Sequence, residues 1–249
     1  MAILLSNDDG ITAFGLQALS DAVATLDEIW IVAPDRNQSA VSHALTLQRP
    51  LRIEQVGERR YAVDGTPTDC VNLAINGILP QRPRLLISGI NHGANLGDDV
   101  TYSGTVSAAM EATLLGVPAI AISQLGSEPF DFGTAVQFVH QLAATVLRDG
   151  IPADTLLNVN VPDGAASRIK GFQLTRQGKR RYSDAVVENV DPRGKKYYWI
   201  GGGEADFVAA EGTDFSAIHS GRISVTPLHL DLTNYVSLQS LQSIQIRFP

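Results

Sequence analysis

The chain has only one cysteine, Cys70, among its 249 residues, and this scarcity excludes two kinds of architecture. A single thiol cannot form an internal disulfide, and it cannot supply a cysteine-rich zinc site. Long apolar runs are missing too, since no stretch approaches the ~18 to 20 residues that a membrane span requires. The N-terminus also lacks the charged and then apolar layout of a signal peptide, because Met1 leads directly into a predicted strand. We therefore expect a cytoplasmic protein that binds no membrane.

Positive charge is scarce relative to negative charge. The chain has 19 Lys and Arg against 26 Asp and Glu, a formal net charge of −7. This balance argues against a dedicated binder of long nucleic acid, although a small phosphorylated ligand needs only a local cluster of cations and donors. With 44% hydrophobic residues, the chain is able to bury a full core. We expect a single α/β domain over residues 1–249.

Short apolar runs alternate with helical patterns through the first two thirds of the chain. The predicted strands are residues 3–6, 29–33, 85–88, 119–123 and 156–161. Between them, apolar residues recur at helical spacing. This alternation predicts a Rossmann-like, doubly wound and mostly parallel sheet, with ligand chemistry at the carboxyl ends of its strands.

The pattern changes beyond about residue 165. Residues 171–176, 197–200 and 222–228 are rich in β-branched and aromatic residues and are separated by polar or glycine-rich stretches. They are typical of an antiparallel arm rather than of another strand–helix–strand unit. We expect a core over about residues 1–165, then a C-terminal β arm and an oligomerisation tail over about residues 166–249.

Two adjacent carboxylates, Asp8 and Asp9, follow the first predicted strand, in the stretch Ser6-Asn7-Asp8-Asp9-Gly10. Neighbouring side chains of a strand point to opposite faces, so the two share one cation only where the backbone turns, which Gly10 permits. The alternative is an ordinary surface turn, for which the same residues are typical.

Polar loops also follow the second and third predicted strands, and they contain Ser39 and Asn91. With Asp8 and Asp9, these residues make an all-oxygen ligand set that suits Mg²⁺ or Mn²⁺ rather than zinc. For Ser39 or Asn91 alone, turn or cap chemistry is the alternative.

A helix is predicted to begin near Ser103-Gly104-Thr105. Ser103 is a good N-cap, and Gly104 allows a ligand to approach the backbone. The free N–H groups, the helix dipole and the two hydroxyls therefore suit a phosphate. A plain capped helix explains the same residues equally well. No Gly-Lys-Ser/Thr of the Walker type occurs, so a metal site next to a phosphate site favours another kind of phosphoryl chemistry.

Six ordered motifs strongly resemble the SurE family of survival-protein nucleotidases. They lie at residues 6–10, 32–39, 65–71, 88–91, 95–97 and 102–106. The resemblance is dense over residues 1–124 and fades after Thr233. It implies a three-layer α/β/α fold and a homodimer or homotetramer. It also implies a metal-dependent phosphatase of nucleoside 5′-monophosphates, often active on 3′-monophosphates and polyphosphate ends as well.

The same resemblance assigns roles to individual residues. It implies one divalent cation per subunit, Mg²⁺ or Mn²⁺, held by the residues that match Asp8, Asp9, Ser39 and Asn91. It places a phosphate among the residues that match Asn95, Ser103, Gly104 and Thr105. We expect a metal-activated water to attack phosphorus, with Asp8 as the proton acceptor and Asp9 chiefly a ligand, although these two roles are interchangeable.

Other polar residues favour structural roles. We interpret His92 as incidental, and we expect His43 and His229, which could lie near the pocket, to make structural hydrogen bonds. The basic residues of the arm are either solvated or guides for polyphosphate; they are Lys179, Arg180, Arg181, Lys195 and Lys196. The stronger rival to a phosphatase is a non-catalytic nucleotide-binding regulatory module, since a cation and a phosphate site bind without hydrolysing.

Overall fold

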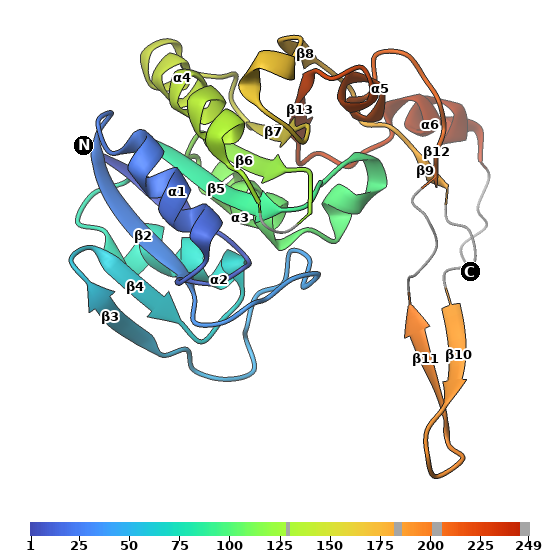
Figure 1. Cartoon of the computed structure of the whole chain (residues 1–249), viewed down its shortest axis with the longest axis horizontal. Coiled ribbons are helices and arrows are strands. Elements are labelled where there is room, and N and C mark those ends of the chain that lie inside the picture. Colours follow the sequence, from blue (N-terminus) through green and yellow to red (C-terminus); the bar gives the residue numbers. More distant parts are fainter. Residues whose placement is uncertain (128–129, 182–185, 201–205, 245–249) are drawn as a thin grey trace.

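A nine-stranded sheet runs through the protein in the order β3-β4-β2-β1-β5-β6-β7-β13-β8 (Figure 1). The computed structural model describes residues 1–127, 130–181, 186–200 and 206–244. The strands of this sheet are β1 (Ala2–Ser6), β2 (Glu28–Pro34), β3 (Ile53–Gly57), β4 (Arg60–Val63), β5 (Leu85–His92), β6 (Ala119–Gln124), β7 (Thr155–Val161), β8 (Phe172–Leu174) and β13 (Ile223–His229). The helices are α1 (Phe14–Val23), α2 (Pro67–Leu73), α3 (Gly104–Leu114), α4 (Gly133–Asp149), α5 (Asp214–His219) and α6 (Tyr235–Ser240). Short 3₁₀ or π turns follow or connect them, at η1 (Ala74–Ile78), η2 (Gly97–Thr101), η3 (Ala166–Arg168) and η4 (Leu241–Ser243).

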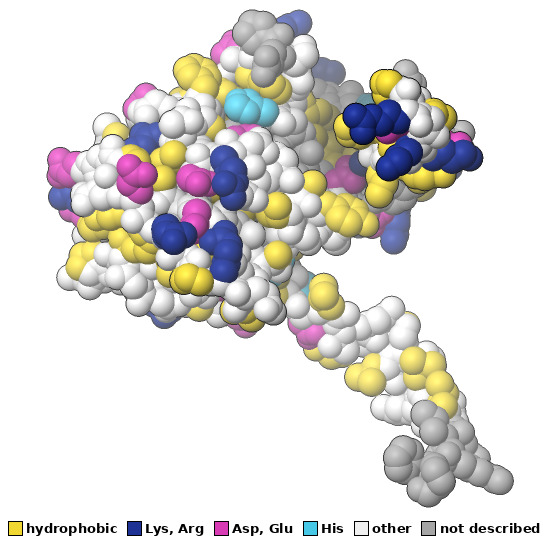
Figure 2. Space-filling model, turned by 90° about the horizontal axis from the view of Figure 1, so that it is seen from below, with side chains coloured by type: hydrophobic (Ala, Val, Ile, Leu, Met, Phe, Trp, Pro, Cys, Tyr) yellow, Lys and Arg dark blue, Asp and Glu magenta, His cyan; other side chains and the backbone are white. Residues whose placement is uncertain are grey.

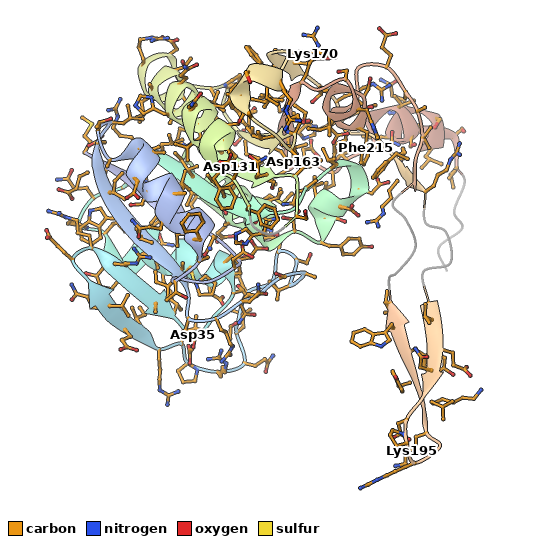
Figure 3. All side chains as sticks on the ribbon, in the orientation of Figure 1. Asp35, Asp131, Asp163, Lys170, Lys195 and Phe215 are labelled. Carbon is orange, nitrogen blue, oxygen red and sulfur yellow. The ribbon has the colours of Figure 1, made fainter. Side chains whose placement is uncertain are left out.

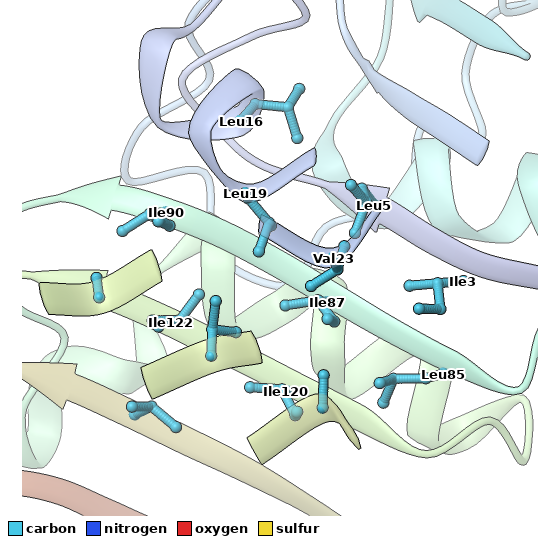
Figure 4. Packing of buried hydrophobic residues seen from close by; sticks show 14 of the residues in the cluster. Ile3, Leu5, Leu16, Leu19, Val23, Leu85, Ile87, Ile90, Ile120 and Ile122 are labelled. Atoms are coloured by element: carbon cyan, nitrogen blue, oxygen red, sulfur yellow. The ribbon is translucent and has the colours of Figure 1, made fainter. Parts of the chain in front are cut away.

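Helices cover both faces of the central strands, so that two hydrophobic cores form. Ile3 and Leu5 of β1 pack with residues of α1 and α4 on one face, as Figure 4 shows for Leu16, Leu19 and Val23 of α1. Leu4, between them, packs with residues of α2 and α3 on the other face. Because neighbouring side chains of a strand point to opposite faces, a strand covered on both sides must be apolar throughout. This confirms the predicted doubly wound, three-layer fold.

The central strands are parallel, as expected. β1 lies between β2 and β5, with Leu5 beside Ile31 and Ser6 beside Ser88. β5 continues through β6 to β7 in the same direction. The carboxyl ends of β1, β2, β5, β6 and β7 therefore meet at one edge of the sheet.

The C-terminal part departs from the prediction. The expectation that residues 171–176 and 222–228 belong to an antiparallel arm is wrong, because β13 pairs antiparallel with β7 and parallel with β8 inside the main sheet. β13 covers an edge of β7 that would otherwise present unpaired backbone groups. Two strands from beyond residue 165 thus complete the sheet. The antiparallel hairpin of β3 and β4 was not predicted.

An antiparallel arm does exist, and it is shorter than expected. It consists of β10 (Val186–Val190) and β11 (Lys196–Ile200), which project away from the sheet (Figure 1). β9 (Arg180–Arg181) and β12 (Asp206–Phe207) pair at its base. Figure 3 places Lys195 at the tip of the arm. The tail expected over residues 233–249 contains α6 and η4, and its last residues, 245–249, lie outside the described part.

On the face in Figure 2, Lys and Arg on the main body are interspersed with Asp and Glu, and more Lys and Arg gather on the separate lobe at the right. No helix in the described ranges combines the length and apolarity needed to cross a membrane.

Candidate active site

The turn after β1 is held by a buried asparagine. The Asn7 side chain donates to the Gly10 carbonyl at 3.1 Å and accepts from the Gly10 N–H at 3.2 Å. Gly10 has a φ of 106°, and a Cβ there would lie 3.1 Å from the backbone carbon of Arg36. Only glycine fits this conformation and this close approach. The turn thus holds Asp8 and Asp9 at the edge where the carboxyl ends of the parallel strands meet.

Asp8 lies against the first turn of α3. Its Oδ1 accepts a hydrogen bond from the Thr105 hydroxyl, and a Cβ on Gly104 would lie 2.7 Å from the Asp8 Cβ. Ser103 is the N-cap, since its hydroxyl oxygen accepts the Val106 N–H at 3.1 Å. The predicted cap is therefore present. The space beside Gly104, which was expected to let a ligand approach the backbone, is taken by the Asp8 side chain. Asp8, Ser103, Gly104 and Thr105 are brought together in space although about 95 residues separate them in sequence.

Burial disfavours the charge on both carboxylates. It raises the pKa of Asp8 from 3.8 to about 6, against the hydrogen bond from Thr105, and the neighbouring charge of Asp9 adds to the rise. Burial also raises the pKa of Asp9, against the effect of His92. Within the described ranges, the buried Asp9 Oδ2 has no hydrogen-bond donor. A buried carboxylate beside a partly exposed one, whose Oδ2 accepts no hydrogen bond, is what a bound divalent cation would compensate.

The loop that carries Ser39 is tied to Asp8 through the backbone. The Gln38 N–H donates to the Asp8 carbonyl at 2.7 Å, and the Ser39 N–H donates to Asn37 Oδ1 at 2.9 Å. Asn37 Nδ2 in turn lies 3.5 Å from Asp9 Oδ1. The neighbours of Ser39 in sequence, Asn37 and Gln38, thus contact Asp9 and Asp8. Ser39 itself makes the turn contact expected under the alternative interpretation.

Asn91 lies one residue before the end of β5. Its Nδ2 donates to the Gly93 carbonyl at 2.9 Å, which leaves the amide oxygen as the group that suits a hard cation. No group of three or more His, Cys, Asp or Glu side chains in the described part of the chain could hold a metal. A cation at Asp8 and Asp9 would therefore need neutral oxygens such as those of Ser39 and Asn91.

Asn95 is held at the same edge by the ends of β6 and β7. Its backbone N–H donates to Asn160 Oδ1 at 2.8 Å, and its carbonyl accepts from Asn158 at 2.8 Å and Asn160 at 3.0 Å. Its own Nδ2 donates to the Ser123 hydroxyl at 2.7 Å. Sequence reasoning gave Ser123, Asn158 and Asn160 no role at the site. Polar residues within otherwise apolar strand patterns, here those of β6 and β7, are the signal that could have revealed them.

Comparison with known proteins agrees with this geometry. The family model of Survival protein SurE matches residues 3–184. A protein of Geotalea daltonii named 5′-nucleotidase SurE is 57% identical over 99% of this chain and 100% of its own length. One of Pelobacter propionicus with the same name is 59% identical over 96% of this chain and 97% of its own length. The chain belongs to the SurE family.

A solved structure extends the match to three dimensions. The crystal structure of the SurE protein from Aquifex aeolicus superposes with a TM-score of 0.87 at 48% sequence identity, covering 97% of this chain and 98% of that one. The resemblance identified from the six motifs is thus confirmed, and this SurE chain shares the family fold over almost its whole length.

His92 was interpreted as incidental, and the structure corrects that interpretation. Its Nδ1 lies 3.3 Å from Asp9 Oδ2, although not in hydrogen-bond geometry. It follows Asn91 directly, and this position next to an expected ligand was the available signal.

His43 and His229 lie in different environments. His43 Nε2 lies 2.9 Å from Glu111 Oε2, and Glu111 Oε1 accepts from Asn72 at 2.7 Å. His43 therefore has the structural hydrogen bond expected of it. His229 pairs with Thr155, the first residue of β7, at the opposite edge of the sheet from Asp8 and Asp9. A position near the pocket is wrong for His229.

Proposed function

We propose that this SurE chain is a 5′-nucleotidase, which hydrolyses nucleoside 5′-monophosphates to a nucleoside and inorganic phosphate. Full-length relatives that carry this name support the proposal. The structural observation that carries it is the contact of the buried Asp8 carboxylate with the first turn of α3, at Gly104 and Thr105. A carboxylate pair beside a helix N-terminus combines a cation site with an anion site, which phosphoryl transfer needs.

The donor set fits one Mg²⁺ or Mn²⁺ per subunit. Asp8, Asp9, Ser39 and Asn91 would hold it. The assignment is supported by Asp9 Oδ2, which accepts no hydrogen bond, and by the raised pKa values of both carboxylates. When bound, such a cation lowers the pKa of a water molecule and neutralises phosphate charge.

The residues of the chain have separate tasks in this mechanism. Asp8 accepts a proton from the attacking water, with its carboxylate oriented by the Thr105 hydroxyl. At the start of α3, the Ser103 hydroxyl and the backbone N–H groups of Gly104 and Thr105 donate to the phosphate oxygens, while the Thr105 hydroxyl stays bonded to Asp8. Asn95, held by Ser123 and Asn160, donates from the other side. Asp9 acts chiefly as a ligand.

Phosphate release tests the proposal. Nucleoside 5′- and 3′-monophosphates and a short polyphosphate are supplied with Mn²⁺, Mg²⁺ or EDTA. The assay compares wild type, Asp9→Ala and the control Asp21→Ala, whose exposed carboxylate lies on α1. We expect metal-dependent release that Asp9→Ala loses and Asp21→Ala keeps. Nucleotide binding without release under any metal would favour the regulatory module instead. Activity on 3′-monophosphates and polyphosphate is part of the proposal and is ranked by the same panel.

We also propose a homodimer or homotetramer in which the arm and the tail contact a partner subunit. A two-stranded hairpin by itself is marginally stable in water. Yet the arm exposes Val186, Tyr198, Trp199 and Ile200, the last to 88%. Exposed apolar residues continue along α6, at Val236 and Leu238. Light scattering coupled to gel filtration should give at least a dimer, and Trp199→Asp should weaken it; a wild-type monomer would contradict the proposal.

A cytoplasmic location remains a proposal from the sequence.

A further inference from the structure

Four aromatic rings form a continuous cluster beside the site. Phe14 is the first residue of α1, and its ring centroid lies 5.9 Å from that of Phe132. Phe132 stacks on Phe130 at 5.8 Å. The His92 imidazole contacts both rings, at 4.8 Å from Phe130 and 5.3 Å from Phe132.

This aromatic cluster begins at a carboxylate of the site. His92 Nδ1 lies 3.3 Å from Asp9 Oδ2, so the rings adjoin the expected cation site. The cluster is well anchored. Gly15 packs against the Ile90 carbonyl so closely that a Cβ would lie 2.1 Å from its oxygen. The Gly133 N–H donates to Oδ1 of Asp131 at 2.9 Å, and Asp131, labelled in Figure 3, lies between Phe130 and Phe132 in sequence.

The four rings of the cluster differ in solvent exposure, so that part of the aromatic surface is open to a ligand. Phe132 is 4% exposed and supports the other rings, whereas Phe14 is 66% exposed. His92 and Phe130 are partly exposed. The cluster therefore combines one buried ring, that of Phe132, with an exposed aromatic surface at Phe14. It leads directly from the carboxylate pair to solvent.

We propose that Phe14, supported by the other three rings, is a stacking platform for the nucleobase of the substrate. This inference rests on the proposed function, because a nucleoside monophosphate carries a charged phosphate and a flat aromatic base on one ribose. A phosphate held next to the cation of Asp8 and Asp9 leaves the base to be placed on an adjoining surface, and every base has a π face that an aromatic side chain binds. Stacking uses no hydrogen-bond readout, so the platform accepts purines and pyrimidines and favours the larger purines.

A phosphate ester without a base makes the test specific. The hydrolysis of adenosine 5′-monophosphate and of ribose 5-phosphate is compared for wild type, Phe14→Ala and Phe14→Tyr. We expect Phe14→Ala to lose about tenfold in kcat/KM for the nucleotide, since stacking on one aromatic residue has about that effect. The loss should arise in KM with kcat nearly unchanged, because the base is bound equally in the ground state and the transition state. Ribose 5-phosphate should be unaffected, and Phe14→Tyr should behave as wild type.

Phe172 offers a matched control. It is 57% exposed and lies 5.9 Å from Phe138 in a tilted ring pair, but it belongs to β8 at the edge of the sheet. Phe172→Ala should leave the preference for the nucleotide unchanged. An equal loss on both substrates in Phe14→Ala, or no loss on either, would overturn the platform.

Direct binding separates this inference from the proposed function. Calorimetry gives the affinities of wild type and Phe14→Ala for adenosine 5′-monophosphate and ribose 5-phosphate. If wild type releases no phosphate, the phosphatase proposal fails. The platform is still supported in that case if wild type binds the nucleotide more tightly than ribose 5-phosphate and Phe14→Ala abolishes this difference. Equal affinity of wild type for the two esters would overturn the platform whether or not phosphate is released.

Discussion

The Asp214 carboxylate accepts the backbone N–H of Gly97 at 2.7 Å, and 117 residues separate the two in sequence. The same carboxylate accepts the N–H groups of Gly178 at 2.8 Å and Phe215 at 2.9 Å. Gly97 begins η2, the turn that leads to Ser103, and Gly178 precedes the base of the arm. One buried side chain of α5 thus joins the phosphate loop to the arm.

Replacing Asp214 with alanine should destabilise the fold by about 3 kcal/mol or more. It leaves the buried N–H groups of Gly97 and Gly178 without acceptors, and each such group costs about 1–3 kcal/mol. Denaturant unfolding monitored by circular dichroism measures the loss. Asp149→Ala, which removes an exposed carboxylate paired with Arg148, is the control and should change little. Equal stability of Asp214→Ala and wild type would contradict the joining role.

Alanine at Gly104 should impair activity by about 100-fold, because the first turn of α3 must then move away from Asp8. Elsewhere in a helix the same change is favourable by about 1 kcal/mol. Gly77→Ala is the matched control, since a Cβ on Gly77 meets nothing within 4 Å. We expect the control to keep its kcat/KM for adenosine 5′-monophosphate. An active Gly104→Ala enzyme would show that the contact with Asp8 is dispensable.

Asp8→Asn should lose about 10³-fold or more in kcat while still binding substrate. The change removes the proton acceptor but keeps a side chain of the same shape next to Thr105. Single-turnover phosphate release and calorimetric titration of the nucleotide separate the two effects. Activity retained in this variant would remove Asp8 from the proton-transfer step.

Divalent cations should stabilise wild type against heat. A ligand that binds only the folded state adds about 2.7 kcal/mol at 100 times its Kd. We therefore expect Mn²⁺ or Mg²⁺ to raise Tm, and EDTA to reverse the rise, without any substrate present. Asp9→Ala should lose the effect and Asp21→Ala should keep it. A rise in Tm that persists in Asp9→Ala would place the cation elsewhere.

Glu111 should make stability depend on pH through its contacts with His43 and Asn72. Burial acts to raise its pKa, but the hydrogen bonds from His43 and Asn72 outweigh burial and hold the pKa below 4.5. A carboxyl group whose pKa is lower in the folded protein than in the unfolded chain stabilises the fold fully at pH values above its unfolded pKa. This stabilisation is lost as the pH falls through the pKa of the folded protein. Unfolding titrations of wild type and Glu111→Gln should therefore differ most at neutral pH and converge below about pH 4.5. A difference that stays constant from neutral pH to acid would refute the charged contact.

Much of the fold and part of the site could be predicted from local pattern. Apolar runs identified five of the parallel strands, β1, β2, β5, β6 and β7, and Ser103 was correctly predicted as a cap, because these features depend on neighbours in sequence. The place of β13 was not predictable in this way, since an isolated strand pattern does not state its partner or its direction. The contact of His92 with Asp9 was missed for the same reason.

The sequence by itself determined the alternation of β1, β2, β5, β6 and β7 with helices, the family, and the residue types available for a cation and a phosphate. These follow from apolar periodicity and from short motifs, which are local properties of the chain. Only the tertiary structure decided which groups meet: Asp8 with Gly104, Asp9 with His92, and Asp214 with Gly97. Such contacts join residues many positions apart, and they form because parallel strands bring their carboxyl ends to one edge and the packed helices hold them there.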